Sequence, residues 1–137
     1  MKVKLDPGAF APQRAHILDA GLDIRSPQTA IVPARDSLII DTGVHVAIPM
    51  GYVGMLKSKS GLNVKFDITS EGVIDAGYTG SIVVKLYNNG DGAYQVNRGD
   101  KIIQLVVLPI SAEDVEIVDE LPEFGERGDN GFGSTGK

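Results

Sequence analysis

Gly72-Val73-Ile74-Asp75-Ala76-Gly77-Tyr78-Thr79-Gly80 places one carboxylate and one aromatic ring between glycines, after a polar run at residues 67–71 and before a strand-like run at residues 82–88. Gly77 can take the positive φ of a short hairpin loop, so Asp75-Ala76-Gly77 predicts a tight reversal. Such a hairpin presents backbone N–H and C=O groups along one edge, with Asp75 and Tyr78 at its tip. This set suits a small planar polar ligand. An ordinary hairpin with a turn Asp and a half-buried Tyr has the same pattern.

Length and composition indicate one domain built from short strands. The chain has 137 residues, with 17 Gly, 7 Pro and abundant Val and Ile. A domain of this length buries roughly two-thirds of the surface that its unfolded chain exposes. The glycine and proline content, together with the β-branched residues, favours many short strands over long helices.

Several classes of protein are excluded or disfavoured. The chain has no Cys, so it has no disulfide, no thiolate metal site and no cysteine catalysis. A net charge of −5 without a basic block argues against a nucleic-acid partner, although a nucleotide could still bind near a few local cations or a metal. The longest apolar run, Leu105–Ile110, is too short to span a bilayer, and the N-terminus has no signal-peptide core. We therefore expect a cytoplasmic protein that binds neither nucleic acid nor a membrane.

Alternating patterns predict strands along most of the chain. The expected strands include residues 1–5, 20–26, 37–42, 44–48, 51–56 and 100–107, with a last edge strand around Val115 and Ile117. Val44, Val46 and Ile48 share one face, and His45 falls on the other. A solvated or interface role for His45 is a simpler interpretation than a catalytic one.

One segment breaks the strand pattern, and one polar residue stands out within a strand. Ser58-Lys59-Ser60-Gly61-Leu62-Asn63 predicts a short helix that Ser60 could cap. Hydroxyls, an ammonium and a glycine at a helix start suit an anion, although a plain capped turn has the same sequence. Gln104 lies in an apolar strand, on one face with Asp100, and needs a polar partner.

The C-terminal segment, Arg127–Lys137, contains four glycines among its eleven residues and is predicted to be a flexible arm. Its amides could wrap around phosphate oxygens while Phe132, bracketed by glycines beside Ser134-Thr135, stacks on a base. The predicted fold is therefore an all-β, jelly-roll-like barrel or sandwich of about ten strands, with one short helix. The domain spans residues 1–126 and the arm spans residues 127–137.

Five motifs in this order resemble those of the trimeric dUTP pyrophosphatase (dUTPase) family: Ala20–Ser26, Ser58–Leu62, Gly72–Gly80, Arg98–Val106 and Arg127–Gly136. The resemblance implies a homotrimer of jelly-roll-like subunits whose three active sites are each assembled from all three chains. It also implies hydrolysis of dUTP to dUMP and pyrophosphate. That reaction keeps uracil out of DNA and supplies dUMP for dTMP synthesis.

The resemblance also assigns roles around the nucleotide. Uracil is held by the backbone of Gly72, Val73 and Ile74, the deoxyribose lies over Tyr78, and Asp75 activates the water that attacks the α-phosphorus. The phosphates meet Lys59, Ser60 and Gly61, with Gln104 reaching them or the water and Asp100 orienting neighbours. The tail of a neighbouring chain closes over the ligand with Arg127, Phe132, Gly133, Ser134 and Thr135.

A metal follows from the charge of the implied substrate. A triphosphate carries roughly −4 at neutral pH, which the few cations named above do not balance, so Mg²⁺ is expected. The ion would be held mainly by phosphate oxygens and water, with Asp23 near it through a water molecule. Two positions depart from the family pattern. Lys59 stands where Arg is usual, and Thr69 stands where Asn often contacts the base.

Two other functions remain open at this point. A dCTP deaminase, or a bifunctional deaminase–diphosphatase, shares the fold but carries a catalytic Glu where this chain has Lys85. A regulator that senses dUTP and signals through a protein partner is the other alternative.

Overall fold

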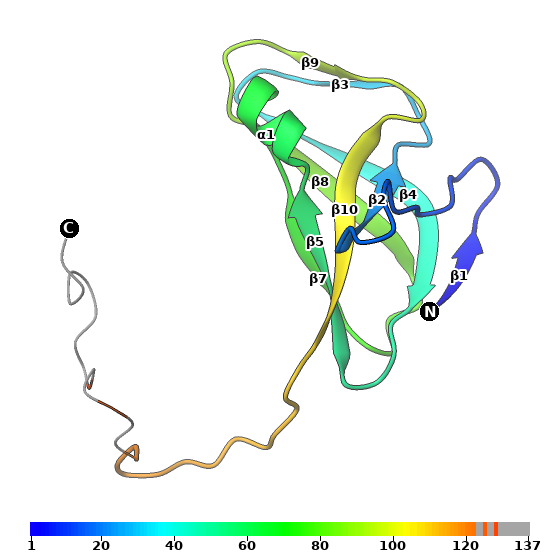
Figure 1. Ribbon diagram of the computed structural model, residues 1–137. Coiled ribbons are helices and arrows are strands. Elements are labelled where there is room, and N and C mark those ends of the chain that lie inside the picture. The colour runs from blue at the N-terminus through cyan, green and yellow to red at the C-terminus, as the bar shows by residue number, and fades with distance from the viewer. Residues whose placement is uncertain (123–124, 126–127, 129–137) are drawn as a thin grey trace.

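The computed structural model describes residues 1–122, Gly125 and Gly128, which form ten strands and one helix (Figure 1). In chain order the elements are β1 (Lys2–Leu5), β2 (Gly21–Arg25), β3 (Ala30–Val32), β4 (Ser37–Ala47), β5 (Tyr52–Ser58), α1 (Ser60–Phe66), β6 (Ile68–Thr69), β7 (Glu71–Ile74), β8 (Ser81–Asn88), β9 (Tyr94–Val96) and β10 (Lys101–Pro109). The predicted all-β, jelly-roll-like fold with one short helix is confirmed. No helix within these residues is long and apolar enough to cross a membrane. The predicted compartment stays a prediction.

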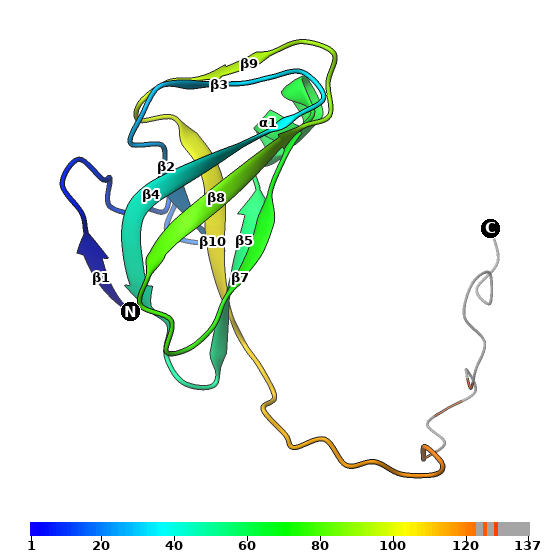
Figure 2. The ribbon, with the colours of Figure 1, turned by 180° about the vertical axis from the view of Figure 1, so that it is seen from behind.

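Two four-stranded antiparallel sheets make the body of the protein. One has the order β1-β4-β8-β6, the other has the order β2-β10-β5-β7, and β3 pairs with β9 in a small third sheet. In Figures 1 and 2 this small sheet and α1 lie at one end of the body, and the connection from β7 to β8 crosses at the other end.

The core forms where the inward faces of the two large sheets meet. Along β8 the residues Ile82, Val84 and Leu86 are fully buried, and the intervening residues are exposed, as the period of two in a strand requires. Ile24 and Leu105 are equally buried on the opposing sheet. Burying each such side chain stabilises the fold by about 1.5–3 kcal/mol.

The predicted hairpin at Gly72–Gly80 is a turn between sheets. β7 pairs with β5 and β8 pairs with β4 and β6, so the two strands that flank the turn belong to different sheets. The local prediction of a reversal was right and the predicted pairing was wrong. Each strand has a long apolar partner elsewhere in the chain, and those ladders take precedence over pairing across the turn.

Two predicted strand patterns are modified by irregularities. The expected strands at residues 37–42 and 44–48 form one continuous strand, β4, whose register shifts around Gly43, where φ is 65°. A second shift at the start of β10 buries both Ile102 and Ile103, so Ile102 does not share an outward face with Gln104. The extra residue in each shift cannot be inferred from alternation alone.

Two further expectations were wrong. Lys59 occupies the N-cap position of α1 and no side chain caps the helix, so Ser60 is its first residue. Residues 110–122 contain no strand, and Val115 and Ile117 are 92 and 96% exposed. Beyond the bond from the Ile110 amide to the Gly51 carbonyl (2.9 Å), residues 111–122 leave the body of the protein and meet no sheet edge (Figure 1).

Candidate active site

The turn after β7 holds Asp75 and Tyr78 beside a cavity of about 210 Å³. Gly77 has a φ of 94°, and the Tyr78 amide donates to the Asp75 carbonyl at 3.2 Å, which closes the turn. Asp75 is exposed, so water can reach its carboxylate. The residues lining the cavity are Val73, Ile74, Asp75, Tyr78, Ser81 and Val83.

One edge of β7 is open next to this cavity. β7 is the terminal strand of its sheet and pairs only with β5 among the described residues. Every second residue of an antiparallel strand turns its N–H and C=O away from its partner. Gly72-Val73-Ile74 therefore offers backbone donors and acceptors to a ligand at this edge.

Tyr78 is held in position by its neighbours within the turn. Its hydroxyl donates to the Ser81 carbonyl at 3.0 Å, and its ring remains 46% exposed. A Cβ at Gly80 would lie 2.3 Å from the Tyr78 hydroxyl oxygen, so only glycine fits against the ring. This packing role of Gly80 was not predicted from the sequence, although the pattern Tyr-x-Gly contains it.

A second polar cluster surrounds Asp23 on β2. Asp23 is 4% exposed, and its carboxylate contacts the Lys59 ammonium through one oxygen and the Lys101 ammonium through the other, the latter at 2.7 Å. Burial raises the pKa of Asp23, but the hydrogen bonds from Lys101 and Lys59 lower it more, and the net shift is downward. Asp23 is therefore ionised and paired.

Lys101 was not among the predicted site residues. It adjoins Asp100 at the start of a strand already expected to carry polar groups, and a buried carboxylate needs cations nearby. Those two facts together could have indicated Lys101 as a site residue from the sequence. Because Lys59 is also paired with Asp23, its positive charge is partly neutralised in this structure.

Gln104 lies directly opposite Asp23 in the ladder between β10 and β2. Its amide donates to the Ser58 carbonyl at 3.1 Å, which supplies the polar partner that the sequence required. A Cβ at Gly21 would lie 2.3 Å from the Gln104 Oε1 atom. Gly21 therefore makes room for the Gln104 side chain.

The remaining predicted residues lie around these clusters. Ser60 and Gly61 form the first turn of α1, and a Cβ at Gly61 would meet no atom within 4 Å. Asp100 accepts from the Asn97 amide at 2.8 Å and shapes the turn before β10. The Thr69 hydroxyl accepts from the side chain of Asn89 at 3.1 Å.

The two clusters lie at opposite ends of β5. Ile74, just before the turn, pairs with Gly54, whereas Glu71 pairs with Lys57, one residue before the end of β5. Gln104 also pairs with Lys57, so the Asp23 cluster and the start of α1 sit at that far end. The described part of a single chain therefore does not bring Asp75 together with Lys59 and Gln104.

Predicted roles for Arg127, Phe132, Gly133, Ser134 and Thr135 lie outside the described residues, as does the rest of the 127–137 arm apart from Gly128. Within the described residues, no group of three or more His, Asp or Glu side chains is arranged to hold a metal ion. Both oxygens of Asp23 already contact ammonium groups. These residues fit a Mg²⁺ ion that arrives with phosphate oxygens, and they do not fit a metal held by protein ligands alone.

Ten strands, one short helix and these two polar clusters define the chain as a jelly-roll protein whose β7 strand has an open edge. Residues 9–136 match the dUTPase family, and the chain belongs to that family. It is 42% identical over 134 residues to the deoxyuridine 5'-triphosphate nucleotidohydrolase of Tropheryma whipplei (strain Twist), covering 95% of this chain and 91% of the relative. It is also 42% identical to the Arabidopsis thaliana protein of the same name, covering 97% and 80%.

Solved phage enzymes share the fold. The dUTPase of Staphylococcus bacteriophage 80alpha with dUpNHpp is 34% identical, with a TM-score of 0.94, and the match covers 99% of this chain and 98% of that one. A mutant dUTPase from phage phi11 of S. aureus, solved with a structural Mg(II) ion, is 35% identical, with a TM-score of 0.82 and coverage of 87% and 96%. The comparisons favour a dUTPase over a deaminase.

Proposed function

We propose that this chain hydrolyses dUTP to dUMP and pyrophosphate, with Asp75 as the general base at the cavity beside β7. The observation that supports this most directly is that an open strand edge, an exposed carboxylate and an exposed aromatic ring share one cavity. Membership of the dUTPase family supports the same reaction. Its consequence for the cell is that uracil is kept out of DNA and dUMP becomes available for dTMP synthesis.

Base selection follows from the open edge of β7. Uracil presents an acceptor, a donor and an acceptor along one edge, and cytosine presents a different order. A fixed backbone edge at Gly72-Val73-Ile74 that matches uracil leaves donors and acceptors unpaired against cytosine, which is strongly unfavourable in a site shielded from water. The sugar is selected by contact, because Tyr78 lies under it and leaves no space for a 2′-hydroxyl.

Asp75 accepts the proton of the water that attacks the α-phosphorus. Its exposed position beside Tyr78 allows a water to lie between the carboxylate and the bound phosphate. A positioned base of this kind contributes about 10²–10⁴ in rate.

The phosphates are bound at the start of α1. Ser60 and Gly61 lie in its first turn, and Lys59 precedes it. An arriving triphosphate competes with Asp23 for the Lys59 ammonium, and Gln104, opposite Asp23, is placed to reach the phosphates or the attacking water. Asp100 holds the turn before β10, and Arg127, Phe132, Gly133, Ser134 and Thr135 close over the ligand from a neighbouring chain.

A Mg²⁺ ion bound with the triphosphate would supply positive charge to stabilise the leaving pyrophosphate. If Lys59 turned to the phosphates, Asp23 would keep Lys101 and would have one carboxylate oxygen free to hold the ion through a water molecule. A solved relative in which a structural Mg(II) ion is coordinated supports the use of this metal.

A homotrimer would allow the Asp75 turn of one chain to meet the Lys59 cluster of another chain. Because Asp75 and the Lys59 cluster lie at opposite ends of β5, a complete site needs the turn of one chain and the cluster of another. The outward face of β8 carries Val83 and Tyr87, 50 and 43% exposed, which supports a subunit contact near the turn. Sedimentation equilibrium at several protein concentrations measures the predicted trimer.

The decisive experiment is pyrophosphate release from each dNTP with and without Mg²⁺. We expect Mg²⁺-dependent release from dUTP alone, and Asp75→Asn as a matched variant should release almost none. Ammonia release from dCTP would instead identify a deaminase. Lys85 makes that outcome unfavourable, because it stands where a deaminase carries a catalytic Glu. Its ammonium lies 5.0 Å from the Tyr87 ring centre and cannot replace a carboxylate.

A further inference from the structure

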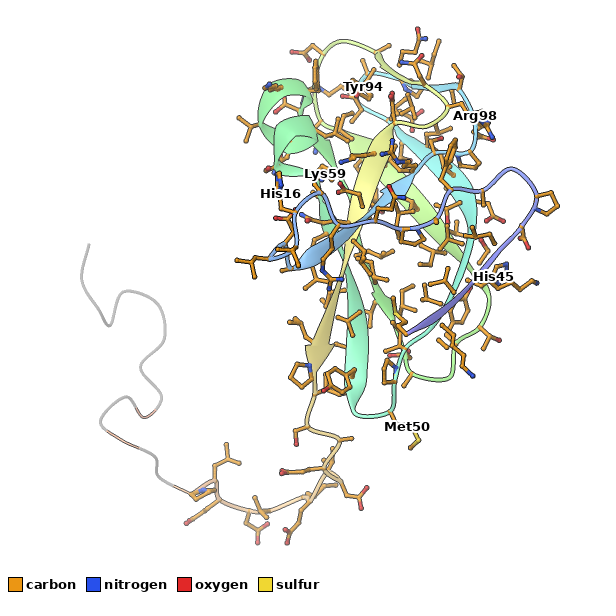
Figure 3. All side chains as sticks on the ribbon, turned by 45° about the vertical axis from the view of Figure 1, so that its right-hand side comes forward. His16, His45, Met50, Lys59, Tyr94 and Arg98 are labelled. Atoms are coloured by element: carbon orange, nitrogen blue, oxygen red, sulfur yellow. The ribbon has the colours of Figure 1, made fainter. Side chains whose placement is uncertain are left out.

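His45 joins the active-site turn to the N-terminal strand. Its Nδ1 atom lies 2.8 Å from the Thr79 carbonyl oxygen, and its Nε2 atom lies 3.0 Å from the Asp6 Oδ2 atom. Asp6 directly follows β1, and Thr79 directly follows Tyr78. Figure 3 labels His45 beside β1 and well apart from Lys59, so this bridge is separate from the Asp23 cluster.

Both partners of His45 are hydrogen-bond acceptors. A carbonyl oxygen has no hydrogen to donate, and an ionised carboxylate has none either, whereas a neutral imidazole has only one N–H. The two contacts are therefore made together only by the imidazolium, which donates from both nitrogens. Consistent with this, the bond to Thr79 and then the bond to Asp6 raise the pKa of His45 above its ordinary value of 6.5.

The charged groups around the bridge come from β1 and from β4, the strand that carries His45. On β1, Lys4 pairs with His45 in the ladder, and its ammonium lies 3.8 Å from the Asp6 carboxylate. The positive charge of Lys4 opposes a positive charge on His45. On β4, Asp41 favours that charge and is itself held by Ser81 and the Gly43 amide. Lys2 and Lys4 line a cavity of about 200 Å³ together with His45 and Thr79.

We propose that His45 is a positioning residue for the turn at residues 75–80, where its imidazolium ties the Thr79 carbonyl to Asp6 and so keeps Asp75 and Tyr78 aligned for hydrolysis. This inference rests on the proposed function. The bonds from the Tyr78 amide to Asp75 and from the Tyr78 hydroxyl to Ser81 are internal to the turn or to its immediate end. The Ser81 hydroxyl, just past the turn, bonds to Asp41 on β4, whereas the His45 bridge ties Thr79 within the turn to β4 and, through Asp6, to the end of β1.

The bridge between Thr79 and Asp6 is broken when His45 loses its proton, because a neutral imidazole can donate to only one of them. It is complete below the ordinary value of 6.5 and disappears as pH rises through the raised pKa, because the Nε2 lone pair then faces the Asp6 carboxylate. The turn then loosens, and kcat/KM for dUTP falls over that range.

Asp6→Asn distinguishes a bridge that depends on the charge of His45 from a contact that only supports the structure. An Asn side chain can donate to a neutral Nε2 or accept from a protonated one. The bridge to Thr79 therefore persists whether the His45 imidazole is neutral or charged. We expect this variant to retain activity and to lose the alkaline fall. His45→Ala removes both contacts, and we expect kcat/KM to drop about tenfold at neutral pH, because a displaced turn misplaces base and substrate. His16→Ala is the matched control, because His16 is the other histidine of the chain.

The assay is pyrophosphate release with saturating Mg²⁺ from about pH 5.5 to about pH 9, paired with an NMR titration of the two histidines and of the amides of residues 75–80. In the wild type those amides should titrate with the same midpoint as His45, and in Asp6→Asn that midpoint should fall. His45→Gln keeps one donor and covers the case in which His45→Ala does not fold; it should lose the alkaline dependence.

Several results would overturn the inference: an unchanged pH profile in Asp6→Asn or His45→Gln, or turn amides that do not follow His45. A wild-type protein that releases no pyrophosphate would refute the proposed function instead. The amide titration would still report whether His45 holds the turn.

Discussion

Replacing Gly80 by Ala tests the geometry of the turn most directly. The added Cβ would lie 2.3 Å from the Tyr78 hydroxyl oxygen and 2.5 Å from Cζ, whereas ordinary contacts begin at 3.4 Å. Gly80 is not at a positive φ, so alanine strains no backbone angle and acts only through this contact. The tip of the Tyr78 ring must therefore move by about 1 Å, since a half-exposed side chain yields more easily than the surrounding backbone.

The expected effects on stability and on catalysis differ in size. Moving Tyr78 breaks its bond to the Ser81 carbonyl, which costs about 1 kcal/mol or less, so Tm should fall by only a few degrees. A shift of about 1 Å beneath the sugar should lower kcat/KM for dUTP by up to about 100-fold. Pyrophosphate release and thermal unfolding measure the two effects on the same preparation.

Two controls sharpen this test. Gly92→Ala places a Cβ where no atom lies within 4 Å, so it should change neither quantity. In a Tyr78→Ala background the Gly80→Ala change should add nothing, because the ring that it displaces is gone. A Gly80→Ala protein within about twofold of wild-type kcat/KM, or the same loss without the ring, would refute the placement of Tyr78 under the substrate.

Four further predictions concern the base, the cations and the tail. Asp75→Asn should nearly abolish turnover while leaving affinity for a non-hydrolysable dUTP analogue within about tenfold by calorimetry, and retention of a tenth of wild-type kcat or more would remove Asp75 from the role of base. Lys59→Arg should be tolerated, whereas Lys59→Ala should raise KM and lower kcat; equal kinetics for the wild type and Lys59→Ala would show that this residue does not reach the phosphates. Because the pKa of Asp23 is lowered, its ion pairs stabilise the fold above its ordinary value of 3.8 and are lost as pH falls through the lowered pKa, so urea unfolding should show an acid loss of stability that Asp23→Asn lacks. Removing Arg127–Lys137 should preserve folding and assembly by sedimentation yet lower kcat strongly, and co-refolding the truncated chain with Asp75→Asn chains should restore some activity if tails act on neighbouring sites.

Local chemistry was sufficient for the elements that depend on a few neighbouring residues. The turn at Asp75-Ala76-Gly77 followed from the conformational freedom of Gly77, and β8 followed from the strand-like run of residues at 82–88. The order of five short motifs was sufficient for the family. In each case the determining interactions lie within the segment itself, so the sequence carries the information directly.

Pairing partners and charge pairs required the tertiary structure. The segment around Gly72–Gly80 reads as a hairpin, yet its strands join different sheets because their ladders form with β5 and β4, far away in sequence. The same holds for Val115 and Ile117, whose alternation predicts a strand but which meet no sheet edge in the described chain. A strand pattern specifies a face, whereas a partner is specified by the packing of the whole sheet.

The site shows the same division. Residue types and their pattern singled out Asp75, Tyr78 and Gln104 as candidate site residues, and the resemblance to the family added Asp23. Only the fold paired Asp23 with both Lys59 and Lys101, because those residues come from three segments that meet when β2 and β10 align and α1 begins beside them. Only the fold placed His45 between Asp6 and Thr79, because such contacts join residues 39 and 34 positions apart in the chain. Long-range contacts of this kind have no local signature, since their free energy is realised only after the strands have packed.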